Sequence, residues 1–201
     1  MRKLLAYLGA FCLLVGAAKD DSLSKAERER GVQHLQKTKK AVLDATKGLS
    51  DAQWNFKSAP DRWSVAEVLE HIAKSEDYLS KLASEQAMKG PPRPAGVNLK
   101  EIDELVLAQI PNRSQKAEAP QPLRPSNEFG SPADTLKHFV ESRDKTIKYL
   151  ETTHGLRDHA IDSPIGKKLD PYQWLLFVSA HSERHTKQIN EVKADPKFPK
   201  A

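Results

Sequence analysis

Residues 170–193 read DPYQWLLFVSAHSERHTKQINEVK, and their pattern is the clearest structural signal in the chain. Asp170 can cap the start of a helix, and Pro171 suits its first turn. From there, core-type positions recur at steps of four, three, four and three residues, which places them on one continuous helical seam. The seam consists of Trp174, Val178, His181, His185 and Gln188. The pattern predicts a helix from Pro171 to about Lys193, with two histidines where leucine would be expected.

Three further helix starts precede this one. At 24–27 and 64–67 a serine is followed three residues later by a glutamate, which is the capping-box pattern. At 131–132 a serine cap is followed by a proline that suits the first turn. The apolar residues that follow recur at helical spacing and predict helices over Ser24–Thr46, Ser64–Met88 and Pro132–Thr153.

Four amphipathic helices of this length predict an all-α fold, a four-helix bundle. Hydrophobic residues make up 38% of the chain and charged residues 29%, which is typical of a globular domain and not of a disordered chain. The inward-facing side chains are expected to form one contiguous core, comprising Leu35, Val42, Val68, Leu69, Ile72, Phe139, Ile147, Trp174 and Val178.

The connection between the second and third helices, residues 90–130, is long and rich in proline. A crossover of this length can carry the chain back along the bundle, so that the second and third helices may run parallel. Apolar residues within it also indicate a short fifth helix that packs on the bundle, namely Leu99, Ile102, Leu105, Val106 and Ile110.

Residues 1–18 have the build of a secretory signal peptide, with a short basic start, an apolar stretch and small residues at 16–18. Cleavage after Ala18 would give a mature domain, residues 19–201, that is exported to the periplasm or the extracellular space. The alternative is an uncleaved anchor, although the apolar stretch is short for a membrane span of about 20 residues. Cys12 is the only cysteine, so the mature chain would have no thiolate to bind a metal.

The charge pattern does not suggest a nucleic-acid partner. The formal net charge is +5, and loss of Arg2 and Lys3 with the signal peptide would lower it to +3. Basic residues are spread along the chain and interleaved with acids, which is typical of a solvated surface. We therefore expect no nucleic-acid partner and no stable membrane insertion after cleavage, while a homodimer remains an open alternative.

Three of the seven histidines have an unusual placement. His181 and His185 are four residues apart, so both can direct a ring nitrogen at a single ion. His71 is the best third candidate, because it follows Val68 by three residues and lies on or beside the inward stripe of its helix. The alternative is a hydrogen-bonded cluster of core histidines. Spacing alone indicates a candidate metal site and no more.

Two segments carry a resemblance to a known family. Residues 63–72, WSVAEVLEHI, and 181–189, HSERHTKQI, are similar to the second-helix and last-helix signatures of the DinB-like family of helical-bundle metalloenzymes. The resemblance covers most of the chain from about Ser24 onward. It implies a bundle of up-down-down-up order. It also implies that His71, His181 and His185 bind one divalent metal ion, with zinc, nickel and iron as candidates, and that water completes the coordination.

The family includes thiol-dependent transferases and isomerases as well as proposed hydrolases. The first interpretation is therefore an exported metal-dependent hydrolase or transferase that acts on an unidentified small molecule. The second is a non-catalytic bundle that binds a metal or a small ligand. No catalytic base or nucleophile stands out in the sequence. Glu67, one turn before His71, could orient that histidine, but its place in a capping box is the favoured interpretation.

Overall fold

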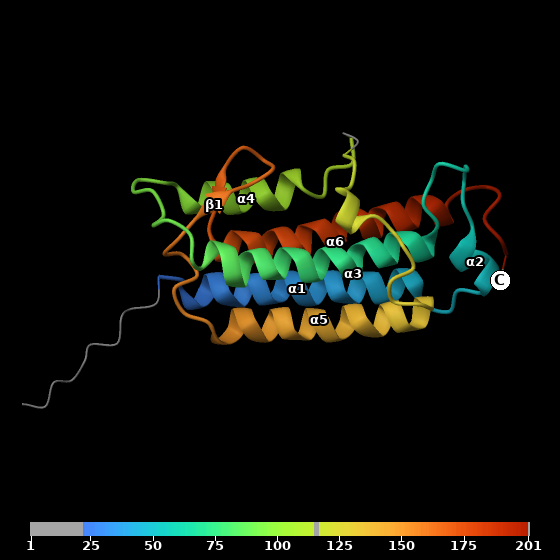
Figure 1. Cartoon of the computed structure of the whole chain (residues 1–201), viewed down its shortest axis with the longest axis horizontal. Coiled ribbons are helices and arrows are strands. Elements are labelled where there is room, and N and C mark those ends of the chain that lie inside the picture. Colours follow the sequence, from blue (N-terminus) through green and yellow to red (C-terminus); the bar gives the residue numbers. More distant parts are fainter. Residues whose placement is uncertain (1–21, 115–116, 201) are drawn as a thin grey trace, which may run out of the picture.

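The computed structural model describes residues 22–114 and 117–200. Within them, four long helices form a bundle (Figure 1). They are α1 (Lys25–Thr46), α3 (Val65–Lys81), α5 (Pro132–Thr152) and α6 (Pro171–Lys193). The predicted four-helix bundle is confirmed, and each helix begins directly after the cap residue expected from the sequence. The predicted signal peptide and its cleavage site lie outside the described residues.

The helix starts are fixed by side-chain caps. Ser24 and Ser64 each accept a hydrogen bond from the amide three residues on, and the glutamate there reaches back to the serine amide. Asp170 forms the same reciprocal pair with Gln173. Such caps satisfy the amides that a helix leaves without partners at its first turn. The missed helix α2 (Asp51–Asn55) also begins at a capping box, between Ser50 and Gln53.

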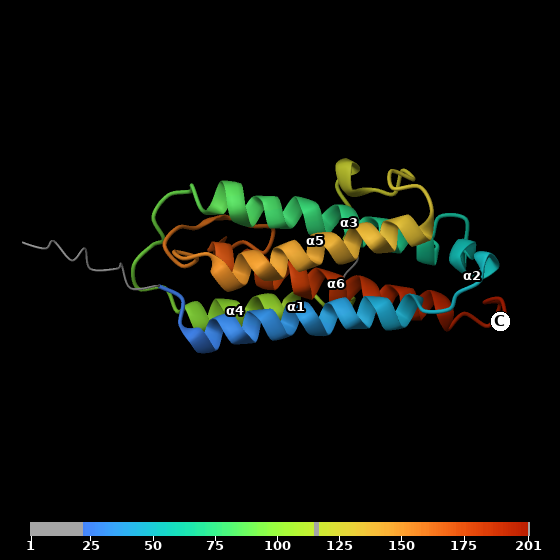
Figure 2. The same ribbon diagram turned by 90° about the horizontal axis from the view of Figure 1, so that it is seen from below.

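The bundle has up-down-down-up order. Asp77 of α3 pairs with His138 of α5, and Ser80, further along α3, bonds Thr146, further along α5. These contacts show that α3 and α5 run parallel. Helices α1 and α6 also run parallel, joined at opposite ends by bonds from Tyr172 to Glu27 and from Lys193 to Ala45. In Figure 2 each of these pairs lies side by side along the bundle.

The crossover makes this order feasible. After α3 the chain forms one π-helical segment, η1 (Leu82–Ala87), and then helix α4 (Leu99–Gln109) runs back along α6. A short 3₁₀ turn, η2 (Gln121–Leu123), contacts α3 before α5 begins. Helix α4 confirms the predicted fifth helix. A two-stranded antiparallel hairpin, β1 (Ile161–Asp162) with β2 (Lys168–Leu169), precedes α6.

The expectation of one contiguous core was wrong. All nine predicted core residues are buried, but they divide between two clusters. Between the clusters lies Arg143 of α5, fully buried, which ion-pairs with Glu76 of α3 and bonds Thr38 of α1 and Ser182 of α6. On each long helix this polar layer lies between the residues of one cluster and those of the other. The error arose because the sequence prediction placed only apolar residues on the inward stripe of α5.

A second buried arginine fixes one end of the bundle. Arg157 pairs with Glu27, Asp103 and Asp170, which belong to or cap α1, α4 and α6. Its guanidinium also lies 4.3 Å from the ring centre of Tyr172. Three carboxylates around one buried cation join α4 to the bundle and thereby set the path of the crossover. None of the helices in residues 22–114 and 117–200 has the length and apolar character needed to cross a membrane.

Candidate metal centre

His71 projects from α3 and is almost fully buried, with 3% of its surface exposed. Its Nδ1 lies 2.8 Å from the carbonyl oxygen of Leu123 in η2. A carbonyl oxygen can only accept, so Nδ1 carries the proton and donates. In the neutral ring, Nε2 of His71 then has a free lone pair directed at α6.

His185 lies on α6 and is likewise buried, with 8% exposed. Its Nδ1 lies 2.8 Å from Oε1 of Gln188, one turn further along. The same Oε1 accepts from Nη1 of Arg113 at 3.3 Å. A guanidinium only donates, so the amide oxygen of Gln188 faces both groups and Nδ1 of His185 is a donor. The Nε2 of His185 is therefore also left with a lone pair.

His181, one turn before His185, is partly exposed. Its ring centre lies 4.4 Å from that of His185 and 5.0 Å from that of His71. On the other side it stacks near Phe177, with 6.4 Å between the ring centres. In the described parts of the chain no hydrogen bond engages its ring nitrogens. His181 is therefore the most exposed of the three histidines.

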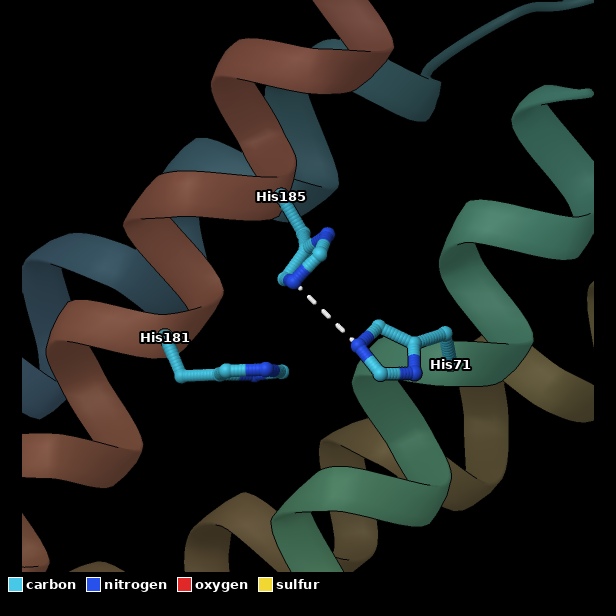
Figure 3. Close-up of side chains that lie close together, drawn as sticks. All are labelled: His71, His181 and His185. Carbon is cyan, nitrogen blue, oxygen red and sulfur yellow. Dashed lines mark hydrogen bonds between the residues drawn. The ribbon is translucent and has the colours of Figure 1, made fainter. Parts of the chain in front are cut away.

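The three rings converge on one point between the helices (Figure 3). Nε2 of His71 and Nε2 of His185 face each other at 3.2 Å, and one nitrogen from each of the three rings lies within 4.8 Å of the others. Two lone pairs this close repel each other unless a cation lies between them. Two nitrogen ligands about 2.0–2.1 Å from a tetrahedral ion would be about 3.3 Å apart. The residues therefore fit a divalent metal ion.

Burial lowers the pKa of all three rings and so favours their neutral form. Burial is the main cause that lowers the pKa of His185 to about 3, and the neighbouring His71 lowers it further. Burial likewise brings the pKa of His181 well below its ordinary value, followed by the effects of His185 and His71. Burial also lowers the pKa of His71, against the opposing effect of its bond to Leu123. A neutral imidazole is the form that binds a metal.

The other histidines lie outside this cluster, as expected from the sequence. His138 bonds Asp77 at 2.7 Å and stacks on Phe129, and His159 bonds the carbonyl of Gly90. Neither His34 nor His154 belongs to the group of potential ligands found in the described residues. The structure thus brings together the three histidines that the sequence singled out.

Two residues near the centre have structural roles. Glu67 bonds Ser64 and Lys57, which confirms the capping interpretation over an orienting bond to His71. Arg184 donates to the backbone carbonyl of Asn112. The residues that bond the second ring nitrogens of His71 and His185 are Leu123 and Gln188. The sequence placed Gln188 on the seam of α6, but it did not indicate Leu123 or Arg113, which contacts Gln188. Both come from the crossover, and a carbonyl that meets a side chain 52 residues away leaves no signal in the sequence.

Carboxylates close to the ligands in sequence are already engaged. Glu70 accepts from the amides of residues 126–128, Glu183 pairs with Lys187, and Glu191 pairs with Arg113. A cleft of about 350 Å³ lies between the first turns of α3 and α5 and the end of the crossover, but none of the three histidines lines it. Of the three histidines, only His181 is partly exposed.

A family model described as the DinB superfamily matches residues 34–189, most of the described chain. The chain belongs to the DinB superfamily. The match contains all three histidines, the whole of α3, most of α6 and the crossover. This DinB-superfamily chain is 29% identical over 148 residues to the uncharacterized protein YuaE of Bacillus subtilis (strain 168). The aligned region covers 73% of this chain and 87% of YuaE.

The fold of the DinB-superfamily chain also matches a solved structure. YfiT from Bacillus subtilis superimposes with a TM-score of 0.55 over 91% of this chain and 95% of YfiT, at 16% sequence identity. YfiT is described as a probable metal-dependent hydrolase with an unusual four-helix bundle topology. At this identity the likeness supports the fold, and the up-down-down-up order found here agrees with a bundle of unusual topology.

Proposed function

We propose that this DinB-superfamily protein is a metal-dependent hydrolase whose single divalent ion is bound by His71, His181 and His185. The observation that carries the proposal is the pair of Nε2 lone pairs, on His71 and His185, that face each other at 3.2 Å while both Nδ1 atoms are held as donors. Zinc, nickel and iron all suit imidazole ligands. The description of YfiT as a probable metal-dependent hydrolase supports the reaction class.

The chain's own residues bind and orient the ion. His71 and His185 approach from opposite helices with fixed tautomers, and His181 completes the set from the more open side. An ion held by three neutral imidazoles acts as a Lewis acid and makes water more acidic, toward a pKa of about 7. A small-molecule substrate would approach from the side of His181, the most exposed of the three histidines.

A non-catalytic metal-binding bundle is the second candidate. The observation in its favour is that Glu70, Glu183 and Glu191 are all paired, so none of these carboxylates is placed as a general base. A hydrolase with this centre would rely on the ion and its three ligands for catalysis.

Hydrolysis assays distinguish the two candidates. The protein, purified without a histidine tag and loaded with zinc, nickel or iron, is assayed on ester, amide and phosphoester substrates. If the protein is a hydrolase, the wild type should lose its activity when the metal is chelated and regain it when metal is added back. The His185→Ala variant should have no activity. If the metal-loaded protein hydrolyses none of these substrates any faster than His185→Ala does, the non-catalytic interpretation holds.

We also propose that the protein is exported. The basic start, apolar stretch and small residues of 1–18 support this proposal.

A further inference from the structure

The crossover contacts the candidate metal centre at two points. Leu123 accepts from Nδ1 of His71, and Arg113 contacts Gln188, which in turn accepts from Nδ1 of His185. Both contacts are on the side of the ring away from the ion. They cannot contribute ligands, but they determine which ring nitrogen carries the proton.

The contact through Gln188 depends on Arg113. A glutamine amide can turn over, presenting either an oxygen that accepts or a nitrogen that donates. If the nitrogen faced His185, it would donate to Nδ1, and the proton of the neutral ring would move to Nε2, where the ion binds. Arg113 prevents this turn, because its guanidinium donates to Oε1 of Gln188 at 3.3 Å. If the amide turned over, its NH₂ group would face the guanidinium, and two donors would be placed against each other.

Arg113 is itself held in place. Its Nε and Nη2 donate to the two carboxylate oxygens of Glu191 at 2.6 and 2.7 Å. This two-point pair fixes the plane of the guanidinium and leaves Nη1 free to contact Gln188. Glu191 lies one turn beyond Gln188 on α6, so the helix that bears His185 also positions the arginine.

The His71 side is organised in the same way by the backbone. Glu70 accepts from the amides of Ser126, Asn127 and Glu128 at 2.9–3.0 Å. Lys74 donates to the carbonyl of Arg124 and to Ser126. These bonds fasten residues 124–128 to α3 and keep the carbonyl of Leu123 over His71. A backbone carbonyl cannot be removed by substitution, so Arg113 is the residue that can be tested.

We infer that Arg113 is a positioning residue of the metal centre, which acts through Gln188 to hold His185 as the Nδ1–H tautomer and to keep its Nε2 free for the ion. This inference rests on the metal binding proposed above. In this inference, the contacts made by the crossover set the tautomers of the histidine ligands before the ion binds. Loss of such an outer contact typically lowers metal affinity about 10- to 100-fold.

The test compares Arg113→Met with Arg30→Met in the full protein. Arg30 is a matched control, because it also joins the crossover to a bundle helix, through an ion pair with Glu104 of α4 at 2.9 Å. Zinc and nickel affinities are measured by competition with a chelator. The tautomer of His185 in the metal-free protein is measured by ¹⁵N NMR of the ring nitrogens. Circular dichroism checks that each variant keeps its helical content.

Arg113→Met should lose about 10- to 100-fold in metal affinity and should show His185 protonated at Nε2 in a substantial fraction of molecules. Arg30→Met should match the wild type in both readouts. Arg113→Lys, which keeps a donor, should recover part of the affinity and provides the test if Arg113→Met does not fold. Wild-type affinity and an unchanged tautomer in Arg113→Met would overturn the inference alone, whereas a wild-type protein that binds no metal would overturn it together with the proposed function.

Discussion

The Arg143 guanidinium and the Glu76 carboxylate form an ion pair at 2.7 Å in which both side chains are completely buried. Arg143 also donates to the carbonyl of Leu35 and to Thr38, so the pair links α1, α3 and α5 at mid-bundle. The pair lies between the two apolar clusters, and a further partner of Arg143, Ser182, is adjacent to His181 in the sequence. A buried charge is tolerated when its partner and its hydrogen bonds are in place.

Removing one partner of this pair should be strongly destabilising. Glu76→Ala leaves the Arg143 charge buried without a carboxylate, which should lower the free energy of unfolding by about 3–5 kcal/mol. The exposed pair of Lys40 and Asp44 is the control, and Lys40→Ala should change stability by less than about 0.5 kcal/mol. Denaturant unfolding measures both variants. If Glu76→Ala and Lys40→Ala lower the free energy of unfolding by similar small amounts, the buried pair does not hold the helices together.

Truncating Ile72 should create a cavity in one apolar cluster. Ile72 is 1% exposed and belongs to the cluster that also contains Phe139. Ile72→Ala should cost about 2–5 kcal/mol of unfolding free energy. Tyr78, on the same helix but 48% exposed, is the control, and Tyr78→Ala should cost much less. A loss of only a few tenths of a kcal/mol for Ile72→Ala would contradict the helix packing described above.

The stability of the metal-free protein should depend on pH through His185. Its pKa is about 3 in the folded protein and about 6.5 when unfolded, so between these values the unfolded state binds more protons. The contribution of His185 to the free energy of unfolding is complete above about pH 6.5. It falls as the pH is lowered toward 3, with a slope that approaches about 1.4 kcal/mol per pH unit. Urea unfolding with chelator present, compared between wild type and His185→Gln, isolates this contribution. A difference that does not vary with pH would contradict it.

Export is tested by the mature N-terminus. If residues 1–18 are a signal peptide, protein recovered from the periplasm or medium should begin at Lys19. N-terminal sequencing gives the answer directly. Recovery of cytosolic protein that still begins at Met1 would contradict export.

Much of this fold was predictable because its signals are local. The serine caps at 24, 64 and 131 and Asp170 fixed the helix starts to the residue. The resemblance to the DinB-like family and the seam of α6 together led to the three histidines. Helix α2 was missed although Ser50 and Gln53 form a capping box. The helix has only five residues, which is too short to show a helical apolar pattern in the sequence.

What could not be predicted depends on contacts between distant segments. Arg143 has an ordinary charged side chain in the sequence, and only Glu76, 67 residues away, makes its burial favourable. Arg113 and Leu123 reach the centre from a crossover whose path is set by the Arg157 pairs and by Glu70. Helical periodicity identifies which face of a helix is inward, but it does not identify the residue that a loop places against that face.

The most direct test of the metal centre is the metal content of the protein after saturation with zinc, nickel or iron and removal of free ions. The three converging histidines predict about one equivalent of at least one of these metals per chain, measured by elemental analysis on protein without a histidine tag. His185→Ala should lose most of it while its helical content stays largely intact, and His34→Ala should retain it. Less than about a tenth of an equivalent for every metal in the wild type would contradict the account and leave His71, His181 and His185 as a hydrogen-bonded cluster.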